Sequence, residues 1–311
     1  MKFNGKFINK GYLGNRLVST NGLLDNIALV SPFEMPADWL KFTAATNSSF
    51  GLNTLSSNQT IEYSLDDGLT WTSLTTNNDV TLNRGEYAYL RGKLTDHNYM
   101  YDYTNFKMSG EIDCSGNIMY LYDYDSPGAN IEYDYAFYNL FKNCTALYSV
   151  PDLPALHLIG EVCYCSMFEG CDSIYLPPRI EARTLSIECC RSMFYGCSFL
   201  SIPPVLYATE LAEYCYDSMF YGCEYLQYGP DLNAIELKTS CYSEMFVNCY
   251  SMESLVCLAI QHSTSNSTYN WMLNAGRDIA YEKFFTRNIQ SYWSRDASGV
   301  PTNNWTILNN N

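Results

Sequence analysis

The cysteines of this chain recur at a fixed interval, and that interval constrains the fold more than any other feature. Two series of cysteines are spaced by 26 residues, apart from a single step of 27. The first series is Cys144, Cys171, Cys197, Cys223 and Cys249, and the second is Cys163, Cys189, Cys215 and Cys241. A fixed period of this size is the signature of a repeat architecture, in which stacked units share one core.

Each repeat unit combines two apolar patterns. In the clearest unit, apolar residues step by two between Leu200 and Ala208, which predicts an extended segment with one buried face. They then step by four between Leu211 and Cys223, which predicts one stripe of a short helix, and Gly222 suits the end of that helix. We therefore predict a structural core made of two ladders: Phe168, Phe194, Phe220 and Phe246, and Cys171, Cys197, Cys223 and Cys249.

The cysteines are predicted to be reduced core residues. Within one unit the two cysteines are eight residues apart, about 12 Å along a helix, which is too far for a disulfide. Disulfides between units are a less favoured alternative. A metal site is the least favoured, because His97, His157 and His262 are far apart in the sequence. We expect no metal and no other cofactor.

The repeat phrase resembles that of a known family. Cys-Tyr-x-x-Met-Phe-x-Gly-Cys at 215–223, followed by Leu226 and Pro230, resembles the BspA-like leucine-rich repeats of Bacteroidales surface proteins. The segments 115–119 and 257–259 are similar to the parts that lead into and close such arrays. Members on the bacterial surface carry an export signal. Similar chains without one occur among virion proteins of phages that infect those bacteria.

The resemblance covers about 38–311 and implies a mixed α/β fold. We expect an N-terminal antiparallel β domain, then a leucine-rich-repeat-like solenoid with short helices, and a C-terminal cap. The expected boundaries are 1–35 for an extended attachment arm, 36–125 for the β-sheet domain, 126–257 for the solenoid and 258–311 for the cap.

One motif in the β domain matches a motif found in enzymes, but it is not a catalytic motif. Ser64-x-Asp66-x-Gly68-x-Thr70-Trp71 fits the Asp-box of sialidases. That box supports a hairpin and is not catalytic, and it occurs in several copies in a propeller, whereas this chain has one. We predict a local hairpin device and no catalytic residues. A glycan-active enzyme is the least favoured function.

Two segments carry the candidate partner-binding residues. Residues 1–35 hold four basic and only two acidic side chains, with too little apolar content to fold alone. This indicates an arm that orders on a partner, and a disordered tail is the alternative. The tyrosines between 99 and 138 form either a partner surface or a cover over the seam between sheet and solenoid. The candidates are Phe3, Phe7, Tyr12, Leu13 and Arg16 in the arm, and Tyr99, Tyr101 and Tyr103 in the second segment.

The charge balance excludes some functions. A net charge of −15 repels phosphate backbones, so we expect no nucleic-acid partner. No apolar run is long enough to span a membrane or to form the core of a signal peptide, so we expect synthesis in the host cytoplasm without ordinary export.

The predicted function is that of a non-enzymatic phage virion protein. We expect a head- or tail-fibre component or adhesin that mediates assembly and host-surface attachment. Its expected partners are other virion proteins, reached through the arm, and a host-surface protein or glycan. We also expect a homo-oligomer. The alternative is a BspA-like adhesin on the bacterial cell surface.

Overall fold

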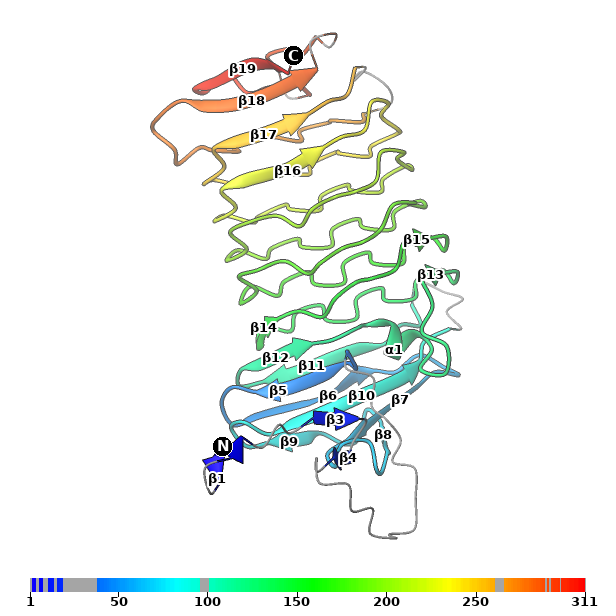
Figure 1. Ribbon diagram of the computed structural model, residues 1–311. Helices are drawn as coiled ribbons and strands as arrows, with labels where there is room; N and C mark the ends of the chain where they lie inside the picture. The colour runs from blue at the N-terminus through cyan, green and yellow to red at the C-terminus, as the bar shows by residue number, and fades with distance from the viewer. Residues whose placement is uncertain are drawn as a thin grey trace.

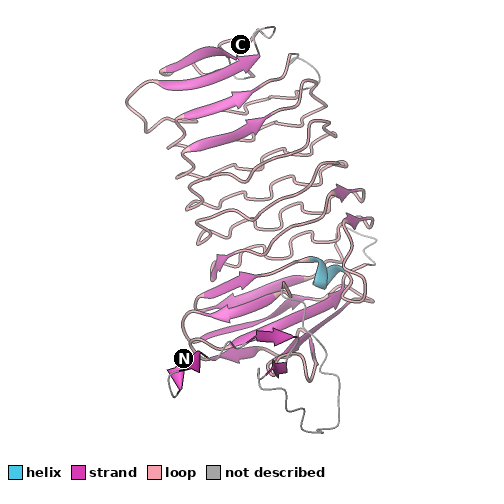
Figure 2. Ribbon diagram, viewed as in Figure 1, coloured by secondary structure: helices cyan, strands magenta, loops and turns pink. Residues whose placement is uncertain are grey.

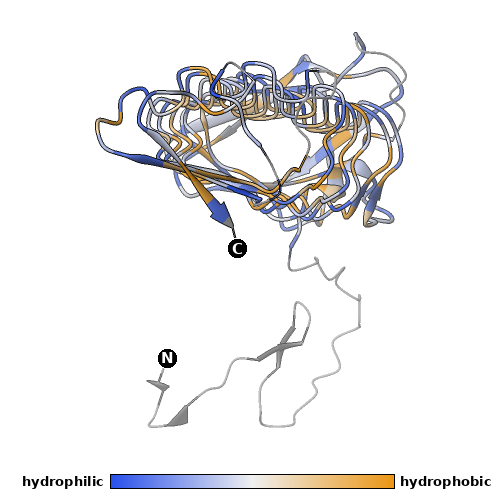
Figure 3. Cartoon of the chain, turned by 90° about the horizontal axis from the view of Figure 1, so that it is seen from above, coloured by the Kyte–Doolittle hydropathy of each residue, from blue (hydrophilic) through white to orange (hydrophobic). Residues whose placement is uncertain are grey.

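The computed structural model describes residues 38–95, 101–260, 266–288, 290, 292–296 and 298–310. It also describes the backbone of four short strands near the N-terminus: β1 (Lys2–Phe3), β2 (Lys6–Phe7), β3 (Gly11–Leu13) and β4 (Arg16–Val18). The body is elongated, with a β-sandwich at one end and the C-terminal cap at the other (Figure 1). Viewed along its axis, the coils between them superpose into a flattened ring (Figure 3).

Two sheets form the sandwich. The larger sheet has the order β14-β12-β5-β10-β7-β8, and the smaller has the order β11-β6-β9. The strands of the larger sheet are β5 (Lys41–Ala44), β7 (Thr60–Ser64), β8 (Thr72–Leu74), β10 (Tyr87–Lys93), β12 (Ile112–Ser115) and β14 (Leu147–Ser149). Those of the smaller sheet are β6 (Ser48–Thr54), β9 (Val80–Leu82) and β11 (Asn105–Ser109). Their inward-facing side chains alternate with outward-facing ones, as in β10, where Ala88 and Leu90 are buried.

The expected mixed α/β solenoid with short helices is wrong. Among the described residues, the one helix is the four-residue α1 (Met119–Tyr122), which precedes the repeats. The repeats themselves consist of turns and short parallel strands (Figure 2). The strands of the repeats are β13 (Asn130–Ile131), β15 (His157–Leu158), β16 (Tyr228–Leu232) and β17 (Ser254–Cys257), and the cap adds β18 (Lys283–Asn288) and β19 (Trp305–Asn310). The last four form one parallel sheet.

A chain of turns occupies the position where each helix was expected. Its backbone enters the left-handed region at every fourth residue, as at Tyr214 (φ 55°), Ser218 (φ 55°) and Gly222 (φ 73°). The Tyr221 N–H bonds back to the Ser218 carbonyl at 3.1 Å, whereas the Gly222 N–H bonds forward to the carbonyl of Val247 in the next unit at 2.8 Å. In an α-helix the backbone N–H groups bond to carbonyls of the same helix. In this segment every second backbone N–H bonds instead to a carbonyl of the next unit. We call 214–222 and its equivalents the turn ribbon.

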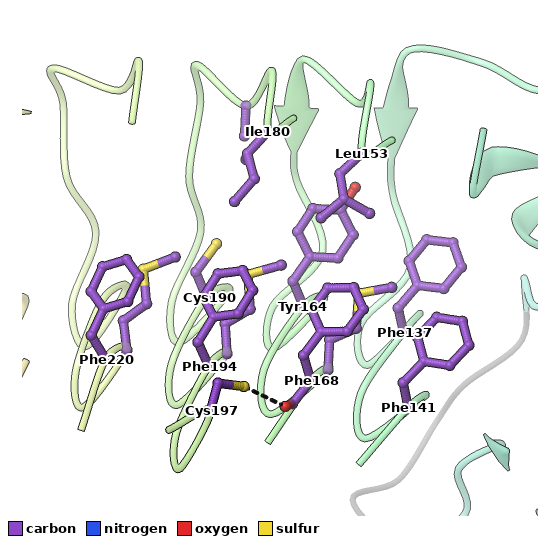
Figure 4. Close-up of a cluster of buried hydrophobic side chains, with 14 of the residues drawn as sticks. Phe137, Phe141, Leu153, Tyr164, Phe168, Ile180, Cys190, Phe194, Cys197 and Phe220 are labelled. Atoms are coloured by element: carbon purple, nitrogen blue, oxygen red, sulfur yellow. Dashed lines mark hydrogen bonds between the residues drawn. The ribbon is translucent and has the colours of Figure 1, made fainter. Parts of the chain in front are cut away.

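One aromatic stack runs through the whole body. Its rings lie in the order Phe106, Phe141, Phe168, Phe194, Phe220 and Phe246. Neighbouring centroids are 5.3 to 5.8 Å apart, and the planes differ by at most 13°. The four predicted ladder phenylalanines are fully buried, and Figure 4 shows three of them, Phe168, Phe194 and Phe220. Because the stack starts in β11, the sandwich and the solenoid share one continuous core across the boundary expected at 125/126.

The cysteines are core residues, as the sequence predicts. All thirteen are buried and unpaired. Each thiol of the first series donates a hydrogen bond to a phenylalanine carbonyl. Cys144 bonds to Phe106 in β11 at 3.3 Å, and the other four bond to the preceding coil: Cys171 to Phe141 at 2.9 Å, Cys197 to Phe168 at 3.1 Å, Cys223 to Phe194 at 3.2 Å and Cys249 to Phe220 at 3.1 Å. The predicted burial of these cysteines in the core is therefore confirmed, and each of these thiols adds a link between neighbouring parts of the body.

Candidate interaction surface

The Asp-box forms a closed loop at the end of β7. Asp66 accepts hydrogen bonds through both carboxylate oxygens, from the Thr70 hydroxyl at 2.6 Å and from the Thr70 N–H at 2.9 Å. The indole of Trp71 donates to the Gly68 carbonyl at 3.1 Å, and the Ser64 hydroxyl accepts from the Gly68 N–H at 2.9 Å. The bonds from Thr70 lower the pKa of Asp66. These groups are used inside the loop, so the predicted hairpin device is confirmed.

The Asp-box tryptophan also helps to close the outer face of the larger sheet. The guanidinium of Arg91 lies 4.2 Å from the ring of Trp71 and 4.5 Å from that of Tyr124, and it pairs with Glu62 at 2.6 Å. The Trp39 ring packs against that of Trp71 with centroids 5.1 Å apart and a tilt of 31°. The aromatic rings and charged groups of this face contact one another, so we do not propose this face as a ligand-binding site.

The tyrosine-rich segment mostly covers the seam between sandwich and solenoid. Tyr120 and Tyr122 are buried. Tyr103 packs edge-on against Tyr138, with centroids 5.5 Å apart. Tyr101 is 91% exposed. Tyr99 lies outside the described residues, so the structure does not show whether all three candidate tyrosines share one face.

The candidate residues of the arm lie in the four short N-terminal strands. Phe3 and Phe7 belong to a hairpin of β1 and β2, and Tyr12, Leu13 and Arg16 belong to a hairpin of β3 and β4. Their side chains lie outside what the structure describes. The attachment role of this segment stays a prediction.

The sequence pattern did not predict a pair of surface aromatic stacks on one edge of the central coils, in which three rings are exposed and Tyr221 is partly buried. Tyr195 stacks on Tyr221 with centroids 4.5 Å apart, and Phe199 stacks on Tyr225 at 5.4 Å. Phe199 is 53% exposed and Tyr225 55%. We call these four residues the edge cluster. Each pair is separated by 26 residues, so an aromatic recurring at the repeat period outside the buried stripe was the available signal.

The turn ribbon fixes the backbone of the edge cluster. Gly196 and Gly222, which follow the two tyrosines, both have φ 73°. The Ser198 N–H bonds to the Gly196 carbonyl at 2.9 Å, and the Tyr225 N–H bonds to the Ser198 carbonyl at 3.1 Å in the preceding coil. The rings are therefore held in place before any partner arrives, which lowers the entropy cost of binding.

The edge cluster has apolar side chains beside it, and the carboxylates of Glu169 and Glu244 act on Tyr195. Four exposed side chains lie nearby in the sequence repeat: Ile202 and Tyr228 follow the cluster positions on the same coils, and Tyr175 and Leu176 belong to the preceding coil. None of these eight residues is charged at neutral pH, on a chain with a net charge of −15. Contiguous exposed apolar surface marks interaction sites. Stacking covers one face of each ring and leaves the second face and the ring edges, and tyrosine and phenylalanine are enriched at protein interfaces, which favours a protein partner.

No family model, curated protein or solved structure matches the chain. Among the residues that the structure describes, there is no helix with the length and hydrophobicity needed to span a membrane.

Proposed function

We propose that this chain is a non-enzymatic virion protein of a phage, a fibre component that holds the particle to the host surface. The observation that carries the proposal is the edge cluster, an exposed aromatic row on a body with one continuous core. Protein interfaces are enriched in tyrosine and phenylalanine, and binding energy concentrates in such rigid anchors. We propose a host-surface protein as the partner of the edge cluster.

The shape of the body supports this role. Parallel hydrogen bonds between coils and the phenylalanine stack from Phe106 to Phe246 join the sandwich to the solenoid. A body of this kind keeps its two ends apart and presents its edge at a fixed orientation. The basic segment 1–35 lies ahead of an acidic body, which favours docking of the arm on another virion subunit. The resemblance to BspA-like virion proteins supports the same placement.

Two measurements test the proposal. The first is mass spectrometry of purified particles, in which we expect the chain at a fixed ratio to the capsid protein. The second is incorporation of tagged protein supplied in trans, in which deletion of 1–35 should abolish incorporation while leaving a cooperatively melting protein. Absence from the particles would reject the virion role. Equal incorporation of the truncated and full-length forms would show that the arm is not the anchor.

A further inference from the structure

A small cavity lies at the C-terminal end of the body, between the last turn ribbon and the loop that precedes β19. Its volume is about 290 Å³. Leu273 contributes exposed apolar surface from the ribbon and Pro301 from the loop, and Arg295, Asp296 and Thr302 contribute polar groups from the loop. We call this cavity the cap pocket. The pocket is lined by residues 272–303, and this part of the chain lies at the opposite end of the body from the sandwich (Figure 1).

The polar groups of the cap pocket are held in position by the cap itself. Arg295 donates from one guanidinium nitrogen to two carbonyl oxygens, those of Pro301 at 2.9 Å and Trp305 at 2.8 Å. Asp296 accepts from the Ser298 N–H at 2.9 Å through one carboxylate oxygen. These bonds orient both side chains, and each has further capacity: Arg295 has other N–H donors and Asp296 has a second oxygen.

A third polar group on the ribbon side is oriented in the same way. The amide nitrogen of Asn274, which lines the pocket, donates to the side-chain oxygen of Asn248 at 2.8 Å. This bond leaves the Asn274 side-chain oxygen as an acceptor. The pocket thus combines fixed donors and fixed acceptors above an apolar wall, an arrangement typical of small-molecule sites.

The chemistry of these groups selects among ligands. A hydroxyl both donates and accepts a hydrogen bond, so a ligand with several hydroxyls can pair with Arg295, Asp296 and Asn274 at once. The opposite charges of Arg295 and Asp296 balance, and the acidic protein repels anions. The apolar wall suits the C–H face of a sugar ring. We infer that the cap pocket binds a neutral monosaccharide unit of a surface glycan.

This inference deepens the proposed adhesive role and rests on it for the source of the sugar. The arm and the cap pocket lie at opposite ends of the chain, so attachment to the particle leaves the pocket at the free end. The edge cluster and the cap pocket then bind different ligands, a protein and a glycan. The two binding proposals can therefore be tested and rejected independently.

The test uses the full-length protein and a panel of neutral methyl glycosides, observed by saturation-transfer NMR. We expect transfer to at least one glycoside, with a Kd on the order of 1 mM. Thr302→Trp should fill the pocket and abolish the transfer, because Thr302 is exposed and lines the cavity. Asp296→Asn should weaken binding about tenfold or more, because it removes a charged acceptor. Thr209→Trp, at an exposed site on the solenoid, is the matched control and should bind like the parent.

Three outcomes overturn the inference: no transfer to any glycoside, unchanged transfer in Thr302→Trp, or stronger binding of methyl glucuronide than of methyl glucoside. Melting temperatures of the variants identify any that fail to fold. If the glycosides fail to bind while edge-cluster variants still lose host attachment, the pocket is rejected and the adhesive role stands. If glycosides bind but the protein is absent from particles, the virion role is rejected and the pocket stands.

Discussion

The thiol of Cys197 donates a hydrogen bond to the carbonyl oxygen of Phe168, 3.1 Å away in the preceding coil (Figure 4). The same oxygen accepts the N–H of Cys171 at 3.1 Å. One buried carbonyl thus receives a bond from its own turn ribbon and a bond from the next coil. Cysteine suits this position because it is small and apolar enough for the core and still carries a donor.

The fold should be indifferent to reductant. Because the thirteen cysteines are unpaired, an excess of dithiothreitol should leave the melting temperature unchanged within about 2 °C. The native protein should also react with a thiol reagent only after unfolding, since all the thiols are buried. A fall of more than about 10 °C on reduction would indicate structural disulfides, because loss of one commonly costs about 2–5 kcal/mol.

Stability should fall at alkaline pH. Burial raises the pKa of Cys144, Cys165, Cys241 and Cys257 to about 12, against about 8.5 in the unfolded chain. The folded state therefore holds these protons over a range in which the unfolded state releases them. Their contribution is fully present below about pH 8.5 and is lost as the pH rises toward 12.

The expected slope is about 1.4 kcal/mol per pH unit for each such thiol. Denaturant unfolding between neutral pH and pH 10 measures it. A free energy of unfolding that stays constant across this range would show that the thiols are accessible in the folded protein.

Neighbouring aromatic residues of one turn ribbon should differ sharply in their effect on stability. Phe220 is fully buried and stacks between Phe194 at 5.7 Å and Phe246 at 5.8 Å, so Phe220→Ala should cost about 3–5 kcal/mol. Tyr221 faces outward and stacks only on Tyr195, so Tyr221→Ala should cost under about 1 kcal/mol. Chemical denaturation of both variants provides the comparison, and equal losses would contradict the assigned burial.

The turn ribbon can be tested at Gly222. Its φ of 73° lies in the left-handed region, and an added Cβ would lie 3.7 Å from the Gly196 Cα. There is room for a methyl group, so the cost of Gly222→Ala comes from the backbone, about 1–2 kcal/mol. Gly128→Ala is the control, because no atom lies within 3.8 Å of its added Cβ. A neutral Gly222→Ala would indicate a helical backbone there.

The sequence predicts the periodic features of this protein but not those that depend on the backbone conformation of single residues. Period, burial and reduced cysteines follow from spacing, because each coil repeats the same contacts. The four-residue step between Cys215 and Met219 fits a helix, but a turn ribbon with a left-handed residue at every fourth position has the same step. Ser218 has the left-handed backbone conformation here. Serine has no strong preference for that conformation, so the residue type does not argue against a helix.

The two candidate binding sites were hidden for different reasons. Tyr221 and Tyr225 are aromatic residues at the same repeat positions as Tyr195 and Phe199. Their stacks lie outside the buried stripe, and the apolar pattern predicts only the buried stripe. The cap pocket depends on how the loop carrying Arg295 folds against the last ribbon, and no periodic pattern reports on that contact.

The most direct test of the account is attachment of the purified full-length protein to host cells, measured by flow cytometry for Tyr221→Ser/Tyr225→Ser. These substitutions remove one ring from each stack of the edge cluster and leave the core intact. The matched control, Tyr269→Ser/Tyr292→Ser, removes two exposed tyrosines elsewhere. We predict at least about tenfold weaker attachment for the edge variant and a change under about twofold for the control. Attachment of the edge variant equal to that of the parent would contradict the account.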